Sequence, residues 1–191
     1  MFILASQSPR RQSLLEELGY VFESQPADID ESVLVGESPA DYVARLALAK
    51  ASAVSEVRAD NLAVLGSDTT VVYEESILGK PEDFDDFERM MNMLSGRTHQ
   101  VLTSISVVQG PLHNTQVIAT QVTFKQLSSK EIKNYWLSGE PQDKAGGYGI
   151  QGLAAQFVAD IQGSYSGVVG LPVYETVQLL SEFGISNSIN G

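Results

Sequence analysis

The sequence predicts an α/β protein whose long mixed sheet is flanked by helices. Short apolar runs typical of buried strands alternate along the chain with segments whose apolar residues recur at helical spacing. Two longer runs, 101–109 and 117–127, alternate apolar and polar residues, with Gly110-Pro111 in the turn between them. These two runs predict an antiparallel pair, and the mixture of strands and helices with long connections indicates a mixed sheet.

The first half of the chain opens on a short buried strand at 2–5. A helix follows at 11–18, and Gly19 ends it. Ser38-Pro39 is a capping residue followed by proline at the first helical position, which predicts a helix running to about Arg58. Further strands are predicted at 20–25, at 62–65, and, after a break at Gly66, at 70–73.

In the second half, helices are predicted at 84–94 and 129–137. A glycine-rich stretch covers 139–152 and precedes a strand at 156–161. A last helix at 172–183 is closed by Gly184, and residues 186–191 are predicted to be frayed. The length suits one domain, 1–191, built as two lobes with a central cleft.

Composition excludes several classes of function. The net charge of −12 disfavours DNA or RNA as a partner, because such affinity comes largely from surface cations. No cysteine and only two histidines are present, so any metal is expected to be a hard cation held by oxygen. His99 follows a predicted helix end and is expected to be a structural histidine with its hydrogen bonds satisfied. No apolar stretch is long enough to cross a bilayer, and the first residues lack the charged start and cleavage site of a secretory signal, which favours the cytoplasm.

Two adjacent arginines, Arg10 and Arg11, stand where the first strand passes through Ser6-Gln7-Ser8-Pro9 into a helix. Free amides and serine hydroxyls at a helix start bind anions, and arginine grips phosphate oxygens in pairs. The alternative is that Ser8 only caps the helix and both arginines are solvated. Cations near a helix N-terminus cost that helix about 0.3–1 kcal/mol, which favours a functional reason for them.

Lys50 lies in the centre of the apolar stripe of the second helix, seven residues after Val43 and four before Val54. It is predicted either to point its ammonium into a site or to lie at the edge of the core. Asp68, in the block LGSDTTVV, follows an apolar run near the carboxyl end of a strand, where ligands of α/β sheets collect. An aspartate there holds a metal or takes a proton from water, although the block alone also suits a turn.

Three further features complete the set. Lys80 precedes a proline in the loop Gly79-Lys80-Pro81, which suits either a cation held toward a ligand or an ordinary turn. The glycine-rich stretches 141–152 and 163–172 allow a close backbone approach to a ligand, and the amide of Gln151 suits a base edge. Glu31, in an acidic stretch, is a metal-ligand candidate. Together the cations and carboxylates suit a triphosphate with a divalent metal, and water as the nucleophile at phosphorus.

Six blocks occur in one order: SQSPRR, GSDT, GKP, SGRTH, DKAGGYGIQG and GSYSGVVGLP. In this order they resemble the Maf family of nucleotide pyrophosphatases over nearly the whole chain, with serine at position 67 where the family usually has alanine. The resemblance implies a fold similar to inosine triphosphate pyrophosphatases and hydrolysis of nucleoside triphosphates to monophosphate and pyrophosphate. It also implies a divalent cation, Mg²⁺ or Mn²⁺, and by analogy a homodimer.

The resemblance implies roles for individual side chains as well. Asp68 maps to the family's proposed general base and, with Glu31, to the metal position. The DKAGGYGIQG block is similar to the subgroup acting on dTTP and UTP, in which Arg10, Thr69 and Gln151 tune the substrate. The side chains expected to contact the phosphates are Ser8, Arg10, Arg11, Lys50 and Lys80.

Two other functions are open on the sequence. One is a nucleotide-binding regulator of cell division that binds a triphosphate without turning it over; it needs the cations but neither carboxylate. The other is a pyrophosphatase for modified nucleotides. A panel of triphosphates separates these from the first expectation.

Overall fold

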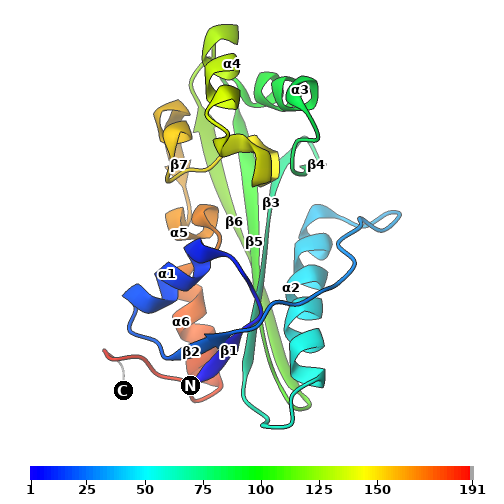
Figure 1. The fold of residues 1–191 in the computed structure, drawn as a ribbon, viewed down its shortest axis with the longest axis vertical. Coiled ribbons are helices and arrows are strands. Elements are labelled where there is room, and N and C mark those ends of the chain that lie inside the picture. Colours follow the sequence, from blue (N-terminus) through cyan, green and yellow to red (C-terminus); the bar gives the residue numbers. More distant parts are fainter. Residues whose placement is uncertain (190–191) are drawn as a thin grey trace.

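The computed structural model describes residues 1–189, and its centre is a seven-stranded mixed sheet (Figure 1). The strands lie in the order β2-β1-β3-β5-β6-β7, and β4 pairs with β3 outside this path. The pairs β1–β2 and β1–β3 are parallel and the others antiparallel, as a mixed sheet requires. The strands are β1 (Phe2–Leu4), β2 (Phe22–Ser24), β3 (Val64–Tyr73), β4 (Ser76–Leu78), β5 (Thr98–Gln109), β6 (Leu112–Phe124) and β7 (Val158–Gln162).

Helices flank this sheet, so the predicted fold class is confirmed. In Figure 1, α2 lies on one side of the long strands, α1, α5 and α6 lie on the other, and α3 and α4 gather at one end. None of the helices in residues 1–189 has both the length and the apolar character that crossing a bilayer requires. The helices are α1 (Pro9–Glu17), α2 (Pro39–Glu56), α3 (Phe84–Leu94), α4 (Ser129–Leu137), α5 (Tyr165–Val169) and α6 (Val173–Glu182), with the 3₁₀ turns η1 (Glu140–Asp143), η2 (Ala145–Gly147) and η3 (Leu153–Phe157).

The alternation of side chains along the strands explains why helices cover both faces. Successive residues of a strand point to opposite faces, so neighbouring residues serve different cores. Ile3 packs in a cluster with residues of α2, whereas Leu4 packs in a cluster that contains residues of α1 and α6. A third cluster, around Phe87 and Phe124, fills the end of the sheet near α3 and α4. One domain with two lobes stays a prediction.

The predicted break at Gly66 is wrong, because β3 runs without interruption from Val64 to Tyr73. Glycine is needed there for packing: a Cβ at Gly66 would lie 2.2 Å from the carbonyl oxygen of Ala47 and 2.8 Å from the amide nitrogen of Ala51. The α2 backbone therefore lies directly on β3. This close approach brings the helix that carries Lys50 onto the strand that carries Asp68.

Other differences concern short elements and element ends. β4 and α5 were absent from the predicted elements, β6 begins at Leu112 rather than at residue 117, and the first residues of the strand predicted at 156–161 belong to η3. The frayed end predicted at 186–191 is wrong at Asn187, which is 7% exposed. Residues 190–191 lie outside the described part of the chain.

Candidate active site

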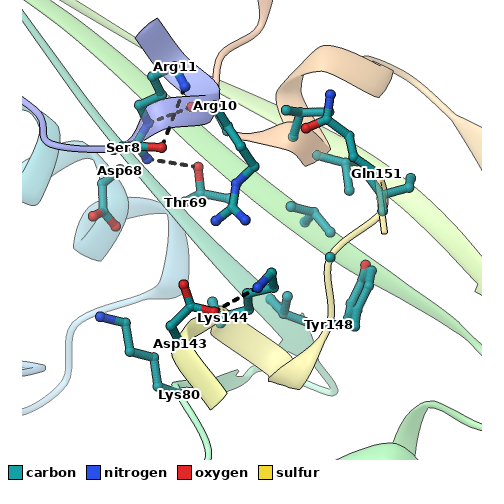
Figure 2. A pocket seen from close by; sticks show the side chains of 18 of the residues that line it. Ser8, Arg10, Arg11, Asp68, Thr69, Lys80, Asp143, Lys144, Tyr148 and Gln151 are labelled. Atoms are coloured by element: carbon teal, nitrogen blue, oxygen red, sulfur yellow. Dashed lines mark hydrogen bonds and ion pairs between the residues drawn. The ribbon is translucent and has the colours of Figure 1, made fainter. Parts of the chain in front are cut away.

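A cavity of about 480 Å³ opens between the start of α1, the middle of β3 and the glycine-rich segment after α4 (Figure 2). Its size is typical of small-molecule sites. In Figure 2, Asp68 and Lys80 lie toward one end of the cavity, and Tyr148 and Gln151 lie toward the other. All nine side chains singled out in the sequence line it: Ser8, Arg10, Arg11, Glu31, Lys50, Asp68, Thr69, Lys80 and Gln151.

Arg11 is built into the wall of this cavity and is not a solvated helix residue. Its Nε donates to the carbonyl oxygen of Gly170 at 2.8 Å, and its Nη2 donates to Oγ1 of Thr69 at 3.2 Å. A third nitrogen, Nη1, donates to Oγ of Ser6 at 3.3 Å. Burial lowers the pKa of Arg11 from its usual value, and nearby Asp68 opposes that shift. The guanidinium thus ties α1 to β3 and to the loop after α5 while its charge faces the cavity.

Ser8 caps helix α1, as one of the two interpretations of the sequence predicts. Its Oγ accepts from the amide of Arg11 at 3.5 Å, and α1 starts at the next residue, Pro9. It also lines the cavity, so the capping position and the cavity wall coincide. The helix start therefore faces the cavity, where helix N-termini attract negative charge.

Lys50 bridges the two predicted carboxylates. Its Nζ lies 2.7 Å from Oδ1 of Asp68 and 2.7 Å from Oε1 of Glu31. The Lys50 and Asp68 side chains are only 12% and 10% exposed, whereas that of Glu31 is 53% exposed. Burial raises the pKa of Asp68 above its usual value, although the charge of Lys50 works against this shift. Lys50 therefore points into the site and does not end at the edge of the core.

Arg10, Lys80 and Gln151 differ from Arg11 and Lys50 in having free ends. In residues 1–189, none of these three side chains makes a hydrogen bond or an ion pair, yet each lines the cavity. Figure 2 shows the guanidinium of Arg10 reaching into the space between Thr69 and the glycine-rich segment. Charged and amide groups without internal partners are available to a ligand.

Thr69 is held from two sides. Its Oγ1 accepts from Arg11 at 3.2 Å and from Oγ1 of Thr103 at 3.0 Å. Its neighbour Ser67, which stands where the Maf pattern has alanine, donates to the carbonyl oxygen of Gly170 at 3.1 Å. The hydroxyl of Ser67 therefore faces the same carbonyl that Arg11 contacts and strengthens the contact between β3 and the α5 loop.

The sequence had not singled out several residues that line the cavity. Lys144 points its Nζ to Oδ1 of Asp143 at 2.7 Å and to the carbonyl oxygen of Glu140 at 2.6 Å. Glu140 and Tyr148 complete this wall. These four residues lie inside or beside the DKAGGYGIQG block, so the block is the sequence feature that could have pointed to them. No spacing rule, however, indicates which side chains of the block face the cavity.

His99 is a buried structural residue, as expected, but with one nitrogen unsatisfied. Its Nε2 pairs with the hydroxyl of Tyr148 at 2.8 Å, and its ring stands edge-on to Phe124 at 5.0 Å between centroids. Nδ1 has no partner in the described residues. Burial lowers the pKa of His99 to about 4 and raises that of Tyr148. His99 thus holds Tyr148, a residue that lines the cavity.

The donor set suits a hard divalent cation better than a soft one. Glu31 and Asp68 already lie within reach of one cationic atom, and carboxylate oxygens are the ligands that Mg²⁺ and Mn²⁺ prefer. Within residues 1–189, no group of three or more histidine, cysteine, aspartate or glutamate side chains is arranged to hold a metal. A cation here therefore depends on water or substrate oxygens for the rest of its shell, as Mg²⁺ at phosphate sites does.

Comparison with known proteins gives one consistent match. The family model described as "Maf-like protein" matches residues 1–183. The chain is 51% identical over 190 residues to a protein of Pseudoalteromonas atlantica named dTTP/UTP pyrophosphatase, covering 98% of this chain and 99% of that one. Proteins with the same name from Colwellia psychrerythraea and Hahella chejuensis are each 55% identical, covering 98% and 96% of this chain and 91% and 92% of theirs.

The similarity to solved structures is lower, as two examples show. The Staphylococcus aureus Ham1 protein gives a TM-score of 0.43 at 15% identity, covering 99% of this chain and 92% of that one. A Mycobacterium abscessus structure titled nucleoside-triphosphatase, dITP/XTP pyrophosphatase, gives a TM-score of 0.43 at 16% identity, covering 67% and 74%.

Proposed function

The chain belongs to the Maf family, and on that premise we propose that it hydrolyses dTTP and UTP to the nucleoside monophosphate and pyrophosphate. One observation carries the proposal: the four cationic side chains and two carboxylates predicted from the sequence all line one cavity of an otherwise acidic protein. Two relatives that are 55% identical to this chain are named dTTP/UTP pyrophosphatase, and we take the two proposed substrates, dTTP and UTP, from that name.

The phosphate chain binds among the cations. Arg10 and Lys80 have free charged ends, and Arg11 is fixed with its charge toward the cavity. Arginine holds phosphate oxygens in pairs, so the arginine pair orients the chain as well as neutralising it. Ser8 and the start of α1 add donors at the same wall. Fixed positive charge around a phosphoryl group is the largest expected contribution to rate.

Asp68 is the proposed general base. Lys50 contacts its Oδ1, which leaves Oδ2 to accept a proton from water. Because burial raises the pKa of Asp68, this carboxylate binds a proton more readily than an exposed one does. The oxygen of that water forms the new bond to phosphorus, the bridging P–O bond breaks, and pyrophosphate leaves with the electron pair.

Glu31 and Asp68 are the proposed ligands of a divalent cation, Mg²⁺ or Mn²⁺. When bound, such a cation supplies charge neutralisation at the phosphate oxygens. At the other end of the cavity, Gln151 presents an amide donor and acceptor to the base, and Arg10 and Thr69 lie between it and the phosphates. The cytoplasm and a homodimer are the proposed compartment and assembly.

Pyrophosphate release from dTTP, measured with Mg²⁺ or Mn²⁺, tests the function. The wild type is expected to release pyrophosphate, and Asp68→Asn to be slower by about 100- to 10,000-fold, the range of a lost general base. Asp160→Asn is the matched control, since Asp160 lies on β7, exposed and outside the cavity. A wild-type rate from Asp68→Asn contradicts the role of Asp68.

The pyrophosphate assay, together with a binding titration, separates the two alternatives of a non-hydrolysing regulator and an enzyme for modified nucleotides. A regulator without turnover binds dTTP, in a titration followed by calorimetry, and releases no pyrophosphate. An enzyme for modified nucleotides hydrolyses a modified triphosphate with a higher kcat/KM than dTTP or UTP. The presence of both Glu31 and Asp68 in the cavity favours turnover over binding alone.

A further inference from the structure

The segment that carries Gln151 is held in place by two side chains outside it, Tyr135 and Glu140. Gln151 itself is exposed and its side chain makes no hydrogen bond or ion pair in the described residues, so its direction depends on its backbone. That backbone contains Gly149 and Gly152, and glycine restricts φ and ψ least of all residues. One turn bond, from the amide of Gly152 to the carbonyl of Gly149 at 3.1 Å, closes the segment on itself.

Glu140 fixes the downstream end of this segment. Its Oε2 accepts from the amide of Leu153 at 2.8 Å, and its Oε1 lies 3.5 Å from the amide of Ala154. The carboxylate lies flat against Gly152: a Cβ on that glycine would lie 2.3 Å from Oε2 and 2.4 Å from Oε1. Gly152 is therefore the residue type that lets the carboxylate reach these amides.

Tyr135 fixes the upstream end and joins it to Glu140. Its hydroxyl accepts from the amide of Gly149 at 3.2 Å and donates to Oε1 of Glu140 at 2.8 Å. The hydroxyl is held as a donor, because burial and the bond to Glu140 raise the pKa of Tyr135. Its ring packs edge-on against Phe157 and beside Phe87 in the core, so the hydroxyl has a rigid base.

We infer that Glu140, with Tyr135, is a positioning residue for base recognition. The two side chains form a clamp on the segment that presents Gln151, with Tyr135 at its upstream end and Glu140 at its downstream end. The inference rests on the proposed function. Within residues 1–189, the side chains of Tyr135 and Glu140 make no hydrogen bond or ion pair with a predicted phosphate-binding side chain. Their bonds run to each other and to the backbone amides of Gly149, Leu153 and Ala154. Its loss should therefore weaken the binding of the base and leave the binding of the phosphates unchanged.

Two measurements on one folded protein separate these effects. KM for dTTP reports base and phosphates together, and the inhibition constant of inorganic tripolyphosphate reports the phosphate site alone. Glu140→Ala is expected to raise KM for dTTP about tenfold to hundredfold, the effect of one lost charged hydrogen bond, and to leave the tripolyphosphate constant within about twofold. Melting temperature checks that the variant is folded.

A double-mutant cycle shows whether Glu140 acts through Gln151. Gln151→Ala alone is expected to raise KM, and adding Glu140→Ala to it should raise KM little further, because the clamp then has nothing to position. Glu131→Ala is the matched control. Glu131 also accepts a backbone amide bond, from Ser128 at 2.8 Å, but at the start of α4, away from the cavity.

The conservative variant Glu140→Gln keeps the assay informative if Glu140→Ala does not fold. Its amide oxygen still accepts from Leu153 but its amino group takes the place of an acceptor for Tyr135, so an intermediate rise in KM is expected. Equal weakening of dTTP and tripolyphosphate, or independent effects of Glu140→Ala and Gln151→Ala, overturns the inference. A wild type that hydrolyses no pyrimidine triphosphate overturns the proposed function, and the inference falls with it.

Discussion

At the scale of single residues, the two adjacent arginines perform different tasks although their chemistry is the same. The side chain of Arg11 makes three hydrogen bonds, to Ser6, Thr69 and Gly170, whereas that of Arg10 makes none with any residue that the structure describes. The first therefore belongs to the fold and to the site, and the second only to the site. The sequence showed both arginines but gave no sign of this difference, since it depends on Thr69 and Gly170, far along the chain.

Removing each arginine in turn tests this division. Arg11→Ala is expected to lower the free energy of unfolding by about 2–3 kcal/mol, because three hydrogen bonds are lost, one of them from a charged donor to the carbonyl of buried Gly170. Arg10→Ala should change it by less than about 0.5 kcal/mol and still raise KM for dTTP. Urea unfolding of both variants measures this; equal destabilisation by the two contradicts it.

His99 makes the stability of the fold depend on pH. Its pKa is lowered to about 4 in the folded protein, from 6.5, because the buried ring loses solvation when charged. Above pH 6.5 the ring is neutral in the folded and unfolded states, so its titration does not change the free energy of unfolding. As pH falls from 6.5 to 4 the unfolded state binds the proton first, so stability falls, by about 3 kcal/mol in total.

The variant His99→Gln isolates this contribution, since glutamine does not titrate and still reaches toward Tyr148. We expect the wild type to lose more free energy of unfolding between pH 6.5 and pH 4 than His99→Gln, by about 3 kcal/mol. Chemical unfolding at several pH values provides the comparison. Parallel pH profiles for the two proteins would show that His99 is charged in the fold.

At the scale of elements, the contact of α2 with β3 sets the geometry of Asp68, the proposed general base. Lys50 comes from α2 and Asp68 from β3, and their 2.7 Å contact depends on how closely the helix backbone lies on the strand. Gly66 permits this approach, because the carbonyl of Ala47 and the amide of Ala51 occupy the place where a Cβ would stand.

Gly66→Ala should therefore move the helix away from the strand. The contacts at 2.2 Å and 2.8 Å are with backbone atoms, which cannot rotate aside. We expect a loss of about 3 kcal/mol in stability and a fall in kcat that exceeds any rise in KM, since Asp68 and Lys50 separate. Gly36→Ala is a contrasting change, because an added Cβ there would have no described atom within 4 Å, although its φ of +79° carries its own strain. An unchanged kcat in folded Gly66→Ala contradicts this account of α2.

Most long elements could be predicted because periodicity accumulates over many residues. The helices α2, α3 and α4 carry capping residues at Ser38, Asp83 and Ser128, which local rules detect. β4 and α5 have only three and five residues, too few for a period to be visible. The bonds of Glu140 could not be predicted for another reason. Its partners Leu153 and Ala154 lie thirteen and fourteen residues away, and no rule of local sequence links residues at that separation.

At the scale of the whole molecule, the distribution of charge is the main fact. The chain holds 12 lysines and arginines against 24 acidic residues, whereas the cavity is lined by five cationic side chains against four acidic ones. The cations are Arg10, Arg11, Lys50, Lys80 and Lys144, and the acids are Glu31, Asp68, Glu140 and Asp143. An acidic surface repels polyanions such as DNA, whereas the local cluster attracts one small anion. The combination suits a free nucleotide and disfavours the same nucleotide within a nucleic acid.

The most direct test of the central claim is the position of bound nucleotide. A crystal structure of Asp68→Asn with dTTP and Mg²⁺ is predicted to show the triphosphate between Arg10, Lys80 and the start of α1, and the base beside Gln151. The slow variant keeps the substrate intact for the measurement. Nucleotide bound outside this cavity, or lying in it with the base toward Asp68 and the phosphates toward Gln151, would contradict the account.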